Sequence, residues 1–139
     1  MTRMPSPPWS RLAVPDVARR IALLGLGVTV AAQFFVLYVP QPVTTPLFSY
    51  ADKVIHASIF AAPVVLALLA GLPARAAVTV IAAHAPVSEM IQHIFLPERS
   101  GDFFDVLADL AGVTLGVVAF RGLGLLVARR QASRSTSPR

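Results

Sequence analysis

The strongest structural signal in the chain is the segment FFDVLADLAGVTLG, residues 103–116, in which two acids interrupt an apolar run. In an α-helix each residue turns by about 100°, so positions four, seven and eleven apart share a face. Asp105, Asp109, Gly112 and Gly116 therefore form one stripe. Glycines at this spacing allow another helix to approach closely in a membrane. The segment predicts a membrane helix whose acids point into a bundle.

The composition of the 139-residue chain also predicts a membrane protein. Hydrophobic residues make up 55% of the chain and charged residues only 14%, against roughly 25% charged residues in soluble domains. The absence of cysteine excludes disulfides, thiolate metal ligands and a cysteine nucleophile. The 12 Lys and Arg outnumber the 7 Asp and Glu, but the arginines cluster at the chain ends and at turns. We therefore expect no nucleic-acid partner.

Four apolar stretches are each long enough to cross a hydrocarbon layer of about 30 Å as a helix. They predict an all-α fold, an integral membrane bundle of four transmembrane helices at about residues 21–39, 53–71, 76–95 and 103–127. The basic, Pro-rich segment 1–20 is predicted to be a solvated tail, and the basic, Ser-rich segment 128–139 a disordered one.

The distribution of Lys and Arg predicts the orientation of this bundle. Four lie in residues 1–20, one is Arg75 and four lie in residues 128–139, whereas the alternate loops hold only Lys53 and Arg99. Basic residues are enriched in cytoplasmic loops. Both termini are therefore expected in the cytoplasm.

Polar groups recur near the predicted outer ends of the last three spans. An ionisable group inside a hydrocarbon layer is costly unless it is paired or reaches water, so its presence is a hypothesis about function. Helix phase places six of these groups on the inward faces of their spans, and Arg99 is expected in the loop beside them. The six are Asp52, His56, Glu89, Gln92, Asp105 and Asp109. The predicted ligand-binding set is Asp52, Lys53, His56, Glu89, Gln92, Arg99, Asp105 and Asp109.

The chemistry of this set allows several interpretations. His56, Glu89, Asp105 and Asp109 are the candidate acid–base groups if the protein is an enzyme, and Arg99 is a candidate phosphate ligand. The same imidazole and carboxylates form a mixed N/O set, but no tight motif such as His-x-x-x-His is present, so we expect no metal and no cofactor. A structural salt-bridge network remains an alternative. Conduction is disfavoured because the inner half of every span looks dry.

Two further histidines have no partner at a fixed spacing. His84 and His93 are interpreted as packed or interfacial polar groups, because a lone histidine is more often one of these than a ligand.

Three motifs in order resemble the VanZ-like family of small polytopic membrane proteins. They are Asp52-Lys53-Val54-Ile55-His56 with Phe60, Glu89-Met90-Ile91-Gln92, and RSGDFFDVLADLAG at residues 99–112 with Gly116. The match covers residues 52–116 and leaves out the first span and both tails. Asp109 stands where the family commonly has Asn, and Phe60 where Tyr is frequent.

The resemblance implies a multi-pass protein of the bacterial cell envelope. The family takes its name from a member associated with resistance to the glycopeptide antibiotic teicoplanin, so the resemblance also implies a link to such resistance. The expected partner is a membrane lipid or a lipid-linked, anionic envelope component, recognised or modified at the outer face. A membrane-embedded enzyme on a lipid-linked precursor is the alternative. The sequence carries no signal for the oligomeric state.

Overall fold

The computed structural model describes residues 15–39, 50–96 and 103–135, and these residues form four helices and no strand. The helices are α1 (Asp16–Tyr38), α2 (Ala51–Leu69), α3 (Ala74–Phe95) and α4 (Phe103–Ser135). The all-α class predicted from the sequence is therefore observed in the described part of the chain. Of the four helices, α1, α2 and α4 are long and apolar enough to cross a membrane.

The remaining helix, α3, is long enough but less apolar. Its 22 residues extend for about 33 Å at 1.5 Å per residue. Polar residues, among them His84, Glu89, Gln92 and His93, interrupt its apolar sequence. Three of these four residues lie in the half of α3 that ends at Phe95. Two of them, Glu89 and Gln92, are buried against the other helices.

Two helix boundaries differ by more than two residues from those predicted from the sequence. α1 begins at Asp16 rather than 21, and α4 continues to Ser135 rather than ending at 127. The tail predictions are therefore wrong for residues 16–20 and 128–135. No Pro or Gly interrupts either extension, Ala, Arg and Gln favour helix, and Arg134 in the last turn of α4 complements the helix dipole. The rest of both predicted tails lies outside the described residues.

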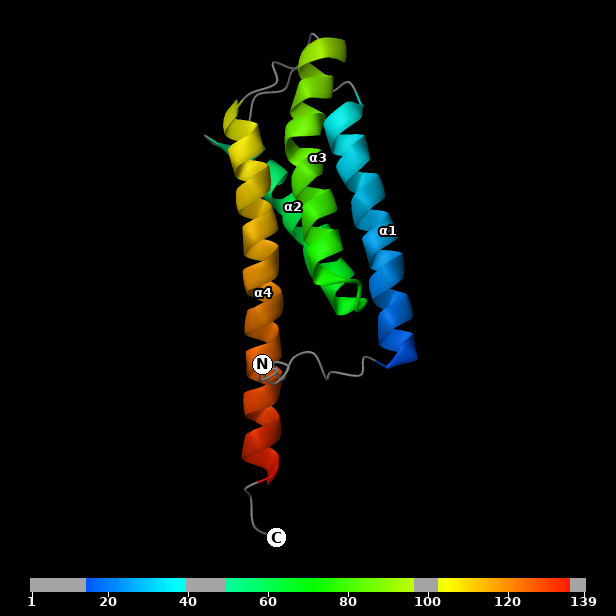
Figure 1. The fold of residues 1–139 in the computed structure, drawn as a ribbon, viewed down its shortest axis with the longest axis vertical. Helices are drawn as coiled ribbons and strands as arrows, with labels where there is room; N and C mark the ends of the chain where they lie inside the picture. The colour runs from blue at the N-terminus through cyan, green and yellow to red at the C-terminus, as the bar shows by residue number, and fades with distance from the viewer. Residues whose placement is uncertain (1–14, 40–49, 97–102, 136–139) are drawn as a thin grey trace, which may run out of the picture.

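The central helix of the bundle is α2, which packs against α4, α1 and α3 (Figure 1). The buried apolar core consists of Leu37, Phe60, Val64, Leu68, Ala85 and Val113. Most other large apolar side chains point outward from all four helices. An apolar exterior of this extent is unusual for a soluble monomer and is what lipid contact requires.

A tight turn joins α2 to α3 where the sequence predicts one. Gly71 has a positive φ of 73°, which costs glycine nothing. The N–H of Gly71 donates to Leu68 O at 3.0 Å, and the N–H of Leu72 donates to Ala67 O at 3.0 Å. This is a Schellman cap, which satisfies carbonyls at the end of α2. Arg19 Nε of α1 donates to Ala70 O at 3.3 Å, so α1 is tied to the same turn.

The closest approach in the bundle is between α2 and α4. A Cβ atom added to Gly112 would overlap the carbonyl oxygen of Ala57, and one added to Gly116 would lie 2.8 Å from Ala61 O and 2.9 Å from Val64 Cβ. The structure thus places both glycines of the stripe against the α2 backbone. Neither position has room for a larger side chain unless the two helices move apart.

The packing predicts a difference between two glycine substitutions in α4. Gly112→Ala is expected to lower the free energy of unfolding by at least about 1–3 kcal/mol, the usual cost of overpacking. Gly122→Ala is the matched control, because nothing lies within 4 Å of its added Cβ, and it should leave stability unchanged or slightly raised. Unfolding in mixed micelles, followed by circular dichroism, measures both. Equal stability of the two variants would contradict the close packing of α2 on α4.

Candidate functional site

Three helix ends that carry polar residues meet at one end of the bundle. The N-terminal end of α2, the C-terminal end of α3 and the N-terminal end of α4 lie together, and the α2–α3 turn lies at the other end (Figure 1). Since α2 runs antiparallel to α3 and α3 antiparallel to α4, residues that are far apart in sequence come to one level. We call the group formed by Asp52, Lys53, His56, Glu89, Gln92, Asp105 and Asp109 the polar cluster.

The centre of the polar cluster is a hydrogen bond between α2 and α4. His56 Nδ1 lies 2.9 Å from Asp109 Oδ1. With Asp109 ionised, the carboxylate can only accept, so Nδ1 is the donor, and in a neutral ring Nε2 then carries the lone pair. The Asp109 side chain is fully buried, with 0% of its surface exposed. A carboxylate charge buried this deeply in an apolar bundle is stable only if its hydrogen-bond partner, here His56, stays beside it.

Two more acids surround the imidazole. Glu89 Oε1 of α3 lies 3.9 Å from His56 Nδ1, and Asp105 Oδ1 of α4 lies 3.9 Å from His56 Nε2. Gln92 Nε2 donates to Glu89 Oε1 at 3.5 Å. His56 therefore lies among carboxylates from both neighbouring helices.

The rim of the cluster is formed by Lys53. Its Nζ lies 2.6 Å from Asp105 Oδ1 and 3.2 Å from Asp52 Oδ2. The Lys53 side chain is 24% exposed and that of Asp52 is 60% exposed. The cluster therefore has an accessible rim of Asp52 and Lys53 above a buried interior of His56 and Asp109.

The structure brings together seven of the eight residues predicted to bind a ligand. Asp52 belongs to the exposed rim rather than to the interior, as its contact with Lys53 shows. The eighth residue, Arg99, lies outside the described residues. One imidazole and two carboxylates, from His56, Glu89 and Asp105, have ligand atoms within 4.8 Å of one another. This grouping is tighter than the sequence spacing indicated.

Sequence reasoning missed a second interhelical contact. Tyr38 Oη of α1 and His84 Nε2 of α3 are 2.8 Å apart, and the His84 ring stacks on Phe34 and Phe60 at centroid distances of 5.2 and 5.7 Å. His84 is thus a packed polar group, as its interpretation in the sequence proposed, but with a specific partner. No spacing in the sequence links Tyr38 to His84, because the pair joins two helices.

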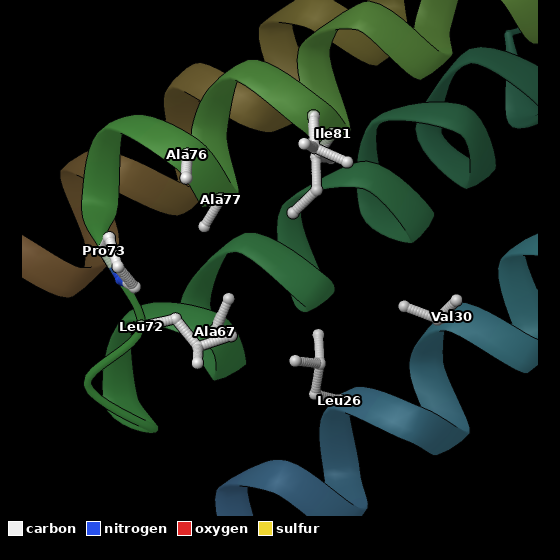
Figure 2. A pocket seen from close by; sticks show the side chains of 9 residues that line it. Leu26, Val30, Ala67, Leu72, Pro73, Ala76, Ala77 and Ile81 are labelled. Atoms are coloured by element: carbon white, nitrogen blue, oxygen red, sulfur yellow. The ribbon is translucent and has the colours of Figure 1, made fainter.

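A cavity at the opposite end of the bundle differs in kind from the polar cluster. It has a volume of about 340 Å³ and lies between α1, α2 and α3. Its walls include Leu26, Val30, Ala67 and Ile81, and nearly all of them are apolar (Figure 2). Specific small-molecule sites combine apolar walls with a few placed polar groups. Since this cavity lacks them, the polar cluster is the better candidate site.

The fold and the apolar exterior are those of a helical membrane protein with a buried polar cluster. No protein-family model, curated protein or solved structure matches the chain. The function is therefore inferred from the geometry of the polar cluster and from the chemistry of its side chains.

The contact between Tyr38 and His84 predicts a stability difference between two tyrosine substitutions. Tyr38→Phe removes the partner of a part-buried imidazole and should lower the free energy of unfolding by about 1 kcal/mol. Tyr50→Phe is the control, because Tyr50 is 77% exposed, and it should have no effect. Thermal unfolding in detergent measures both variants. A Tyr38→Phe variant as stable as the control would show that the hydrogen bond contributes nothing.

Proposed function

We propose that this chain is a VanZ-like integral protein of the bacterial cell membrane that recognises an anionic component of the cell envelope at the outer face. The observation that carries the proposal is the burial of His56, Glu89 and Asp109, with the part-buried Asp105 beside them, in a bundle whose exterior is apolar. A bundle of helices in lipid can be held together by small residues and apolar packing alone. Ionisable groups that packing does not require are by default functional.

The order of the polar residues supports the family assignment. The three motifs that resemble the VanZ-like family supply every described member of the polar cluster, from three helix ends. The family resemblance also motivates a link to glycopeptide sensitivity. We take that link as part of the proposal, with an envelope component as the partner.

Charge distribution supports the orientation of the bundle and the crossing of all four helices. Arg19, Arg20 and Arg75 lie at the end opposite the polar cluster, and Arg129 and Arg130 belong to the turns of α4 that extend past that end (Figure 1). Basic residues mark the cytoplasmic side. The polar cluster then faces outward, and α3, which runs alongside the other helices of the bundle (Figure 1), crosses with them despite its polar half.

Lys53 is the group through which we expect an anion to be recognised. It is the partly exposed cation of the described cluster, and Asp52 and Asp105 hold it in place. A phosphate or carboxylate arriving from the headgroup layer would meet Lys53 before it met the buried acids. Arg99 follows α3 in sequence and would add a second cation with the fork geometry that suits phosphate.

A membrane-embedded enzyme on a lipid-linked precursor is the second candidate. His56 and its neighbouring acids are within the distance at which a proton can be exchanged directly or through one water. Glu89 or Asp105 would serve as the base and His56 as the acid. A structural network, in which the groups only neutralise one another, is the alternative to both.

Cysteine labelling tests the orientation, and the absence of natural cysteine makes it direct. Single cysteines at Thr44 and at Ser100 are expected to react with an impermeant thiol reagent added to intact cells. A cysteine at Ser133 is expected to react only after the membrane is opened. The reverse pattern would show that the polar cluster faces the cytoplasm.

Conservative substitution tests the functional role of the polar cluster. Glu89→Gln and Asp105→Asn keep the size of each side chain and remove its charge, so we expect both variants to abolish an envelope phenotype such as altered glycopeptide sensitivity. Asp16→Asn is the control, because Asp16 is an exposed acid at the other end of the bundle. The phenotype is scored at equal protein abundance in the membrane.

Two outcomes of this experiment contradict the proposal. Full phenotype in both variants at normal abundance would mean that the charges are not used. Loss of the variants from the membrane, with normal phenotype in whatever remains, would identify the cluster as a structural network.

A further inference from the structure

The ligand atoms of His56, Glu89 and Asp105 have the spacing of a site for a single metal ion. They come from α2, α3 and α4, and all lie within 4.8 Å of one another. Metal–ligand bonds of about 2.0–2.2 Å in a tetrahedral site separate two ligand atoms by about 3.4 Å. His56 Nε2 and Asp105 Oδ1 are 3.9 Å apart, which is too far for a hydrogen bond and close to that separation, and the same Oδ1 also contacts Lys53 Nζ at 2.6 Å.

The imidazole is held in the tautomer that a metal needs. With Asp109 ionised, His56 Nδ1 donates to it at 2.9 Å, and a neutral ring then has its lone pair on Nε2, which lies 3.9 Å from Asp105 Oδ1. Glu89 Oε1 lies 3.9 Å from Nδ1 and would turn toward Nε2 to share the ion. A carboxylate on the far nitrogen is the usual support for a metal-binding histidine, since it orients the ring and raises its basicity. Asp109 therefore acts as a positioning residue behind His56.

The charge balance of the buried interior also favours a cation. Glu89, Asp105 and Asp109 surround one imidazole, and Asp109 Oδ2 is fully buried without a hydrogen-bond partner among the described residues. An unsatisfied carboxylate oxygen at this depth is costly unless positive charge lies nearby. A divalent ion on Nε2 would lie across the imidazole ring from Asp109 and would offset the summed negative charge of the three acids.

We infer that His56, Glu89 and Asp105 bind one divalent transition-metal ion, with Asp109 orienting His56. This inference goes beyond the proposed function, because the purified protein can bind a cation in the absence of any envelope component. It also departs from the expectation based on sequence spacing, because the three ligands come from three helices and need no local motif.

The contacts of Lys53 are compatible with a bound cation. Lys53 Nζ contacts Asp105 through Oδ1 and has Asp52 Oδ2 as a second acceptor at 3.2 Å. Asp105 can therefore offer its other oxygen to the metal while Oδ1 keeps the ammonium. Alternatively, Lys53 can turn to Asp52, which is exposed and needs no rearrangement of the interior.

The ligand set indicates which ions bind best. One imidazole and two carboxylates suit Zn²⁺ and Mn²⁺ better than Mg²⁺ or Ca²⁺, which prefer oxygen ligands alone. For a given set of ligands Zn²⁺ binds more tightly than Mn²⁺. We therefore expect the order of affinity Zn²⁺, Mn²⁺, Mg²⁺.

The test is titration of ZnCl₂ and MnCl₂ into the full chain, purified in detergent without a polyhistidine tag and stripped with EDTA. Calorimetry should show one Zn²⁺ per chain. His56→Asn, Glu89→Gln and Asp105→Asn should each weaken binding by more than about tenfold. Asp109→Asn should weaken it by about 10–100-fold, the usual effect of losing the carboxylate that orients a metal-binding histidine. Zinc X-ray absorption of the unaltered protein should show one imidazole with oxygen ligands.

His93→Asn and Asp16→Asn are the matched controls, because they remove an exposed imidazole and an exposed carboxylate outside the polar cluster. Both should bind Zn²⁺ as the unaltered chain does. The inference is overturned if the unaltered chain binds no Zn²⁺, if His93→Asn abolishes binding, or if the three ligand substitutions leave affinity within about twofold. Should one ligand variant fail to fold, the absorption spectrum of the unaltered protein decides: a spectrum without imidazole overturns the site.

Discussion

The close approach of α2 to α4 is the constraint on which the rest of the structure depends. Gly112 and Gly116 leave no side chain between the two backbones, so Ala57 and Ala61 of α2 pack directly on α4. This contact sets the register of α2 against α4, so that His56 lies level with Asp109. Asp109 precedes Gly112 by about one turn of α4. In a membrane, lipid tails are as apolar as the side chains, so there is no hydrophobic driving force between helices. Close packing of this kind is therefore a main source of helix association.

The polar cluster opposes the stability that this packing provides. A charged residue at the centre of a membrane helix costs about 3 kcal/mol on insertion scales, and the cluster holds several. Pairing His56 with Asp109 and Lys53 with Asp105 recovers part of that cost. Apolar residues of similar size would often hold such helices as well or better. The free-energy cost of burying these charges is therefore the physical reason to interpret the cluster as a functional site rather than as a structural network.

Helix phase predicted the inward position of most polar side chains of the cluster, but Asp52, which shares a face with His56, is 60% exposed. Asp105 and Asp109 lie on the glycine stripe of α4, and His56 and Glu89 lie on small-residue faces of their own helices. The pairings could not be predicted in this way. Whether His56 meets Asp109 or Asp105 depends on a shift of a few ångströms between helices, and phase within one helix carries no information about that shift. The contact of Tyr38 with His84 was missed for the same reason.

The sequence by itself determined the lengths of the apolar segments, and these lengths define an all-α membrane protein. It also determined that acids and glycines share one stripe of a helix, because hydropathy and the 3.6-residue period are local properties. The sequence did not predict correctly where α1 begins and where α4 ends. The charged residues there indicated tails, whereas the helix propensity of the same residues continues both helices. Only the tertiary structure decided that Asp109 holds His56 and that ligand atoms from three helices meet within 4.8 Å. Those distances depend on how closely the backbones approach, and that approach is a property of the packed bundle rather than of any one segment.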